Sequence, residues 1–154
     1  MLVVLVSVAA FADEPPPRIA TGRVSTFTGL PDLLGASVTL HVIPWVDVEV
    51  GGSALLLGTT LWARGGPRYL LGDWLDESCR GLTLTVSALF GYKWVEALGG
   101  VTRGFHFAGA FELTRWLSPH LGVAVQVAGG GTFDPGRTNR RVFPDLRLSF
   151  GVAL

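Results

Sequence analysis

The feature that most constrains what this chain can fold into is a strict alternation of apolar with small or polar side chains. The sequence closes on "DLRLSFGVAL", in which every second residue from Leu146 to Leu154 is apolar. Side chains of a β-strand point alternately to its two faces, so this period places the apolar residues together on one face. A helix would need apolar residues at i, i+3 and i+4, and these windows lack that spacing. The chain is therefore predicted to be all-β.

The alternation returns along most of the 154 residues and predicts eight strands that pair in sequence order as antiparallel neighbours. The first strand alternates less regularly, and Gly65, Gly66 and Pro67 interrupt the fourth, which predicts a bulge or kink. In the fifth, Leu89 is an apolar exception in the polar row. The predicted strands span residues 19–28, 34–43, 46–54, 58–71, 82–94, 104–115, 120–129 and 144–154. The longer connections are predicted at residues 72–81, 95–104 and 130–143.

The beginning of the chain is predicted to lie outside the folded domain. Residues 1–12 resemble a secretory signal peptide, with an apolar run followed by the small-x-small cleavage pattern "AFA". No Lys or Arg precedes the run, so either the start codon lies further upstream or the signal is a weak one; a buried N-terminal strand is the alternative. Residues 13–18 contain three prolines in a row and are predicted to form an extended linker. The folded domain is expected to span residues 19–154.

The composition indicates what the apolar faces contact. Hydrophobic residues make up 49% of the chain and charged residues 16%, against roughly a quarter charged in soluble domains. The second face of each strand is rich in Gly, Ala, Ser and Thr, which suits the crowded interior of a narrow barrel better than a solvent-exposed surface. Strands cross a membrane only as a closed barrel, because an open edge leaves backbone groups unpaired in hydrocarbon. We therefore expect a single closed, antiparallel, up-and-down transmembrane β-barrel with its apolar residues facing lipid.

In strand number, strand length and closing alternation, the chain resembles the small eight-stranded outer-membrane β-barrels of Gram-negative bacteria, the OmpA transmembrane-domain and OmpX type. The resemblance implies an integral outer-membrane location, both termini on the periplasmic side, and insertion by the barrel-assembly machinery. That machinery reads a terminal strand that usually ends on an aromatic residue, whereas this chain ends on Leu154. The apolar residues of the predicted insertion strand are Leu146, Leu148, Phe150, Val152 and Leu154.

Aromatic residues near the ends of the predicted strands are expected to form girdles at the two membrane–water interfaces, where ring and polar tip are both accommodated. These residues are Trp45, Tyr92, Trp94, Phe105 and Trp116. Outer-membrane lipid is accordingly the first predicted partner.

Ionisable and amide side chains on the polar face are expected to form a luminal network in which acids and bases pair. Its predicted members are His41, Asp47, Glu49, Lys93, His106, Glu112, Gln126 and Arg147. A contact of His41 with the strand of Asp47 is expected, because the turn at Pro44 joins their two strands. No Ser lies close to a His at a strand end, as nucleophilic catalysis needs, so no catalytic residue is predicted. The three histidines fall on separate strands, so neither a metal site nor a cofactor is predicted.

The charges give little support to partners other than lipid. The formal net charge is zero, which argues against a nucleic-acid partner. The one concentrated basic feature is the predicted loop "DPGRTNRR". Guanidinium groups suit phosphates, so lipopolysaccharide is a candidate partner for this loop, with an ordinary solvated loop as the alternative. The arginines concerned are Arg137, Arg140 and Arg141.

Together these features favour a non-enzymatic outer-membrane barrel with a structural or surface-interaction role, whose lumen is plugged by its own side chains. Two alternatives stay open at this point. A secreted lipocalin-like barrel would bind a small apolar ligand and would turn the apolar rows inward. A barrel-embedded lipid-modifying enzyme would need a catalytic arrangement in the lumen.

Overall fold

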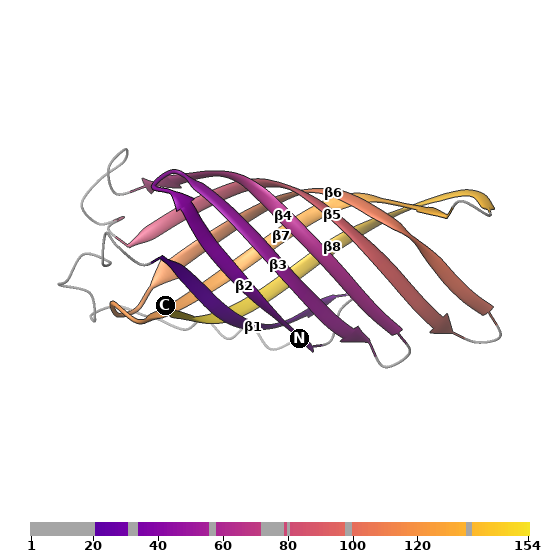
Figure 1. Cartoon of the computed structure of the whole chain (residues 1–154), viewed down its shortest axis with the longest axis horizontal. Coiled ribbons are helices and arrows are strands. Elements are labelled where there is room, and N and C mark those ends of the chain that lie inside the picture. Colours follow the sequence, from indigo (N-terminus) through magenta and orange to yellow (C-terminus); the bar gives the residue numbers. More distant parts are fainter. Residues whose placement is uncertain are drawn as a thin grey trace.

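The described part of the chain is one closed barrel of eight antiparallel strands (Figure 1). The computed structural model describes residues 21–30, 34–55, 58–71, 79, 81–97, 100–134 and 137–154. The strands are β1 (Gly22–Leu30), β2 (Leu34–Ile43), β3 (Val46–Leu55), β4 (Gly58–Leu70), β5 (Leu82–Ala97), β6 (Gly100–Trp116), β7 (Leu121–Asp134) and β8 (Arg137–Ala153). Each strand pairs with its neighbours in sequence and β8 pairs with β1, so the predicted fold class is confirmed. None of the described residues forms a helix long and apolar enough to cross a membrane.

The strand boundaries agree with the predicted ones in the first half of the chain and differ in the second. The prediction of long connections at 95–104 and 130–143 is wrong, because only two residues separate β5 from β6 and β7 from β8. A period-two apolar signal stops where a strand leaves an apolar environment, whereas the hydrogen-bonded ladder continues with polar residues. In this extension Val95 pairs with Thr102 and Glu96 with Val101. The predicted signal peptide and linker, residues 1–18, lie outside the described residues.

The two ends of the barrel differ in how far the strands reach. One end, which we call the termini end, holds Thr21 and Leu154 and lies on the left in Figure 1. The opposite end, which we call the hairpin end, holds the connections that follow β1, β3, β5 and β7. There, the β5–β6 and β7–β8 hairpins reach beyond the β1–β2 and β3–β4 hairpins (Figure 1). Strands β1–β4 contain 9 to 13 residues and form the short half, whereas β5–β8 contain 14 to 17 and form the long half.

Apolar side chains cover the outside of the barrel, and polar ones fill its inside. Phe111 is 59% exposed, whereas the next residue, Glu112, is 4% exposed. Val125 and Gln126 repeat the contrast, at 45% and 4%. The rows alternate as a strand requires, with the apolar row outward. This orientation is the reverse of the one that the lipocalin-like alternative needs.

Three large apolar side chains point inward and break the pattern. Phe27, Trp62 and Leu89 form the buried hydrophobic cluster of the barrel. Their position explains the irregular alternation of the first and fourth predicted strands and the exception in the fifth. Glycine makes room for the two rings, because a Cβ on Gly51 would lie 2.6 Å from the Trp62 ring and one on Gly35 would overlap the Phe27 ring.

The interruption of β4 at its glycines and proline does not shift the strand register. Gly65 pairs with Ala88 and Arg68 with Thr85, so the same register against β5 holds on both sides of Pro67. The predicted bulge is therefore wrong, since no extra residue is inserted. Proline is accommodated because it points outward and gives up only one ladder donor.

Candidate functional site

A charged network crosses the lumen, and we call it the Glu112 network (Arg23, Glu49, Arg64, Glu112 and Thr114). Glu112 accepts a hydrogen bond from Arg23 Nη2 at 2.7 Å on one carboxylate oxygen and contacts Arg64 through the other. Arg64 also donates from Nε to Glu49 at 2.7 Å. Arg23 Nη1 donates to Thr114 Oγ1 at 3.1 Å. All five side chains are buried, so each charge finds its partner inside the barrel, as burial requires.

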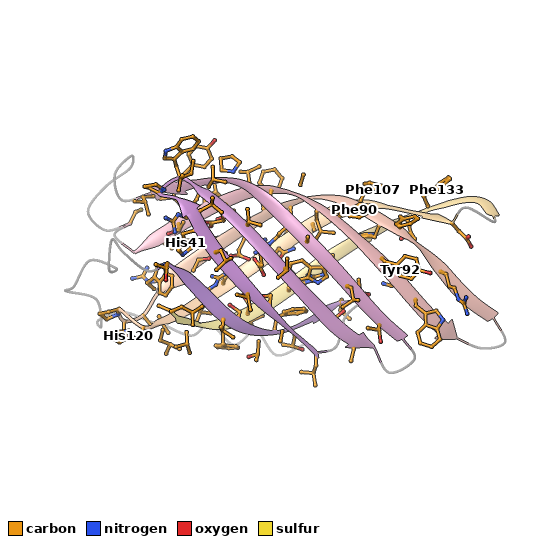
Figure 2. All side chains as sticks on the ribbon, viewed as in Figure 1. His41, Phe90, Tyr92, Phe107, His120 and Phe133 are labelled. Carbon is orange, nitrogen blue, oxygen red and sulfur yellow. The ribbon has the colours of Figure 1, made fainter. Side chains whose placement is uncertain are left out.

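A second polar cluster lies nearer the termini end, where Figure 2 shows His41. His41 Nδ1 lies 2.7 Å from Asp47 Oδ1, across the turn between β2 and β3. Thr85 Oγ1 donates to Asp47 Oδ2 at 3.2 Å. Arg68 adds a charge, with its Nε 3.6 Å from Asp47 Oδ1. Asp47 is thus engaged by three partners from three other strands.

An aromatic–cation stack lies inside the barrel, and we call it the plug (Phe27, Trp62, Asp145 and Arg147). The Arg147 guanidinium lies 4.9 Å from the ring centre of Phe27 and 4.8 Å from that of Trp62. Asp145 holds the same guanidinium through a 2.7 Å ion pair to Nη2 and a 3.2 Å hydrogen bond from Nε. Cation–π contacts are worth about 2 kcal/mol when desolvated. Because its members come from β1, β4 and β8, the plug spans the barrel.

The luminal space beside the Glu112 network is too narrow for water. A gap of about 170 Å³ lies between Asp47, Glu49, Arg64, Gly65, Thr85 and Ser87, and it has no room for a sphere the size of a water molecule. Within the part of the chain that the structure describes, no three His, Cys, Asp or Glu side chains gather as a metal ion would need. The arrangement holds charges in fixed positions and narrows the lumen.

The remaining predicted luminal residues are His106, Gln126 and Lys93. His106 is buried, and its Nδ1 lies 3.4 Å from Thr132 Oγ1. Gln126 is buried beside Glu112, its register partner on β6. Lys93 is half-buried on β5, near the hairpin end.

Sequence reasoning missed Arg23, Arg64 and Asp145, which are all buried. The two arginines lie on strands whose inward rows also hold a large aromatic residue, so those rows did not look polar. Residues two positions apart on a strand lie on the same face, so once Trp62 is known to point inward, Arg64 must point inward too. By the same rule, Asp145 follows from Arg147.

The predicted interface aromatics lie toward both ends of the outer surface. Trp45 and Trp116 are at the termini end, and Tyr92, Trp94 and Phe105 lie toward the hairpin end. The Tyr92 and Phe105 rings meet edge to face, 5.6 Å apart. Phe90, Phe107 and Phe133 lie on the same extended hairpins (Figure 2).

The three arginines predicted to lie in a loop belong to a strand. β8 begins at Arg137, and its ladder pairs Arg137 with Asp134 and Arg141 with Thr132, so the loop prediction is wrong for Arg140 as well. Their side chains lie outside the described part of the structure. The anion contact therefore stays a prediction.

These features define a class of protein: a closed, eight-stranded antiparallel barrel with an apolar outer face and an ion-paired lumen. Among solved structures, the crystal structure of the N-terminal β-barrel domain of Pseudomonas aeruginosa OprF is similar to this chain, with a TM-score of 0.64 and 12% sequence identity. The similarity covers 86% of this chain and 95% of that one. The resemblance to the eight-stranded outer-membrane barrels is thus confirmed at the level of the fold. No family model matches the sequence, and none of the curated proteins gives a significant match.

Proposed function

We propose that this chain is a non-enzymatic, integral outer-membrane β-barrel protein of a Gram-negative bacterium, with a structural or surface-interaction role and a lumen sealed by its own side chains. The observation that carries the proposal is the inverted polarity of the barrel. Large apolar side chains such as Val127, 54% exposed, lie outside, and charged ones such as Arg64 are buried inside. In water, an apolar surface of this extent is an aggregation hazard, whereas in hydrocarbon it is the stable arrangement.

The height of the apolar surface supports a membrane-spanning role. On β5 the outward apolar residues run from Leu82 to Trp94, twelve positions apart. At about 3.3 Å per residue and a tilt near 45°, they cover roughly 28 Å along the barrel axis, close to the ~30 Å of a bilayer core. Trp and Tyr at the two ends of this surface then meet the lipid headgroups.

The plug and the Glu112 network support a sealed lumen without catalysis. An eight-stranded barrel has an interior just wide enough for side chains to fill. The carboxylates of the two clusters, Glu49, Glu112 and Asp145, each form an ion pair with an arginine. We therefore assign these side chains a structural role. Pairing is also the condition under which buried charges are tolerated.

Three partners follow from the proposal. Lipid covers the outer face, and the barrel-assembly machinery inserts the chain by reading β8, whose apolar row ends at Val152 and Leu154. Phosphates of lipopolysaccharide bind the arginines at the start of β8, including Arg137 and Arg141, through guanidinium–phosphate hydrogen bonds.

Extraction and conductance of the full-length chain test the proposal. We expect the protein to need detergent for extraction, to migrate differently on a gel before and after boiling, and to give no conductance steps in a planar bilayer. Recovery as a monomer in plain buffer would overturn the membrane assignment. Steady conductance would overturn the sealed lumen and leave the membrane assignment intact.

A further inference from the structure

The apolar belt around the barrel differs in height between the two halves. On β2 the outward apolar residues run from Val42 to Leu34, eight positions apart, against twelve from Leu82 to Trp94 on β5. At about 3.3 Å per residue and a tilt near 45°, the belt is roughly 19 Å high at β2 and roughly 28 Å high at β5. We call these the short belt and the long belt.

The difference arises at the hairpin end only. At the termini end, backbone hydrogen bonds connect neighbouring strands around the rim, such as His41 N–H to Thr21 O at 3.0 Å and Trp116 N–H to Gly81 O at 2.9 Å. The strand ends therefore stay connected there, on the left in Figure 1, and among the described residues no hairpin projects beyond its neighbours as it does at the other end. The short belt is lower because its apolar residues end at Leu34, next to the β1–β2 connection.

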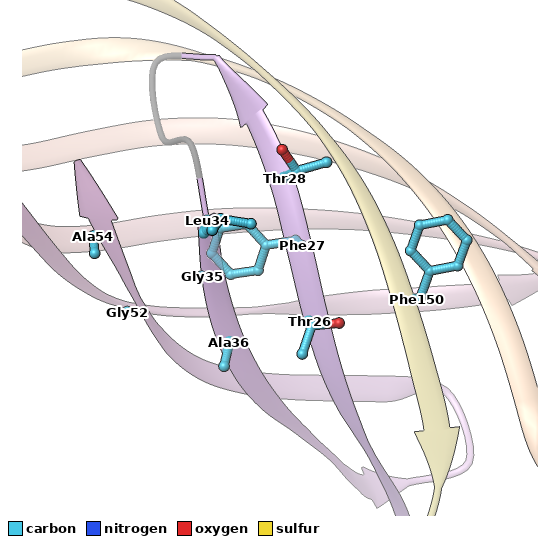
Figure 3. A pocket seen from close by; sticks show the side chains of 9 residues that line it. All are labelled: Thr26, Phe27, Thr28, Leu34, Gly35, Ala36, Gly52, Ala54 and Phe150. Carbon is cyan, nitrogen blue, oxygen red and sulfur yellow. The ribbon is translucent and has the colours of Figure 1, made fainter. Parts of the chain in front are cut away.

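A groove of about 570 Å³ lies on the outer face beneath this end (Figure 3). Leu34 and Phe150 flank it, and small residues of β1–β3 such as Thr26, Ala36 and Gly52 line it. Its surface is almost entirely apolar. Ladder hydrogen bonds satisfy the backbone beneath it, so the groove presents only apolar contacts and two threonine side chains.

We propose that lipid thins locally at the short belt, and that an acyl chain of the leaflet at the hairpin end occupies the groove. The proposal rests on the membrane role proposed above. Strand ends leave backbone groups without ladder partners, and each costs several kcal/mol in hydrocarbon. A bilayer about 30 Å thick would submerge the β1–β2 end, whereas deforming lipid costs only fractions of a kcal/mol per Å. The lipid therefore adapts, and its displaced chains fill the groove.

Two residues at equal height give a direct test. Leu34 lies eight positions from the rim residue Val42, and Phe90 lies eight positions from the rim residue Leu82. Both point outward, at 68% and 49% exposure. In a flat bilayer around an upright barrel, probes at these two positions would reach the same depth.

The experiment measures the depth of spin labels in the full chain carrying Cys79→Ser, inserted into dioleoylphosphatidylcholine vesicles. Labels are placed with Leu34→Cys, Phe90→Cys, Val42→Cys and Leu82→Cys, one per variant. We expect the Leu34 label to be about 9 Å shallower than the Phe90 label, since Leu34 ends its belt and Phe90 lies four positions below Trp94. The two rim labels should reach equal depth. In vesicles of dilauroyl lipid, whose bilayer is thinner, the difference between Leu34 and Phe90 should shrink.

Three results would contradict the proposal. Equal depths for Leu34 and Phe90 would mean that the bilayer is not thinned. A difference between Val42 and Leu82 would mean that the barrel tilts instead. Chain that fails to float with the vesicles would overturn the membrane role as well, which separates the two proposals. Ala36→Cys and Ala88→Cys, each six positions from the rim, provide a second matched pair if a first variant does not fold.

Discussion

The short half and the long half of the barrel share one interior but present different outer faces. Outside, the long half carries contacting aromatic rings, including Phe90 and Phe107 at 5.0 Å, whereas the short half carries small residues beside its groove. Inside, charges of both halves join, because Glu112 of the long half binds Arg23 and Arg64 of the short half. The comparison teaches that paired charges link the two halves inside the barrel, while their outer faces differ in height and in the side chains they present.

The largest expected effect comes from breaking the charge link between the halves. Glu112→Ala leaves Arg23 and Arg64 without their shared acceptor in the lumen, which should cost about 3–5 kcal/mol of unfolding free energy. Urea unfolding in detergent micelles, followed by gel migration, measures the loss. Glu49→Ala is the control within the short half, because in that variant Arg64 keeps its ion pair with Glu112. A loss from Glu112→Ala no greater than that from Glu49→Ala would refute the link.

The plug gives the next effect. Trp62→Ala should destabilise the barrel by about 3–5 kcal/mol and should open an ion path, because it removes the ring on one side of Arg147. Planar-bilayer conductance checks the opening. Thr83→Ala, from the long half, truncates a buried side chain eight residues along β5 from Gly91, the register partner of Trp62, and should leave the lumen closed. Equal conductance of the two variants would show that the stack does not seal the lumen.

Lysine on the outer face should have different costs in the two halves. Ala88→Lys lies well inside the long belt and should cost about 2–4 kcal/mol of assembly free energy. Ala36→Lys, at the same number of positions from the rim, lies close to the top of the short belt and should cost about 0–1 kcal/mol. The folded fraction in vesicles measures both variants. Equal penalties would argue for one belt of uniform height.

The smallest effect concerns the outer aromatic rings. Phe105→Ala removes ring contacts with Phe90 at 5.9 Å and Tyr92 at 5.6 Å, and should cost about 0.5–1.5 kcal/mol of unfolding free energy per contact. Thr26→Ala on the outer face of the short half should change stability by less than about 0.5 kcal/mol. Urea unfolding midpoints in the same micelles compare Phe105→Ala with Thr26→Ala. An equal loss of unfolding free energy in the two variants would show that the ring contacts do not stabilise the barrel.

The sequence alone predicted what depends on strict alternation. The outward rows of β2, β5 and β7 were predictable because nearly every second residue is apolar, as from Leu34 to Val42. The hairpin extensions were not, since their pairing continues through polar residues such as Thr102 and Thr132.

The luminal site was only partly predictable. Inward Phe27 and Trp62 hid the polar rows that carry Arg23 and Arg64. The pairing of Arg23 with Glu112, 89 residues apart, needs the register and the closure of the barrel. The local sequence pattern predicts neither the register nor the closure, because both depend on how all the strands between Arg23 and Glu112 pair.

One measurement tests the inverted polarity most directly: lysine placed at two consecutive residues of β7, Val125→Lys and Gln126→Lys, with insertion into vesicles compared. Val125 faces outward and Gln126 inward, beside Glu112. We predict that Val125→Lys loses about 2–4 kcal/mol of assembly free energy while Gln126→Lys, which replaces one long polar side chain with another, assembles nearly as well as the unmodified chain. Assembly of Val125→Lys as complete as that of the unmodified chain would contradict the assignment of the apolar face to lipid.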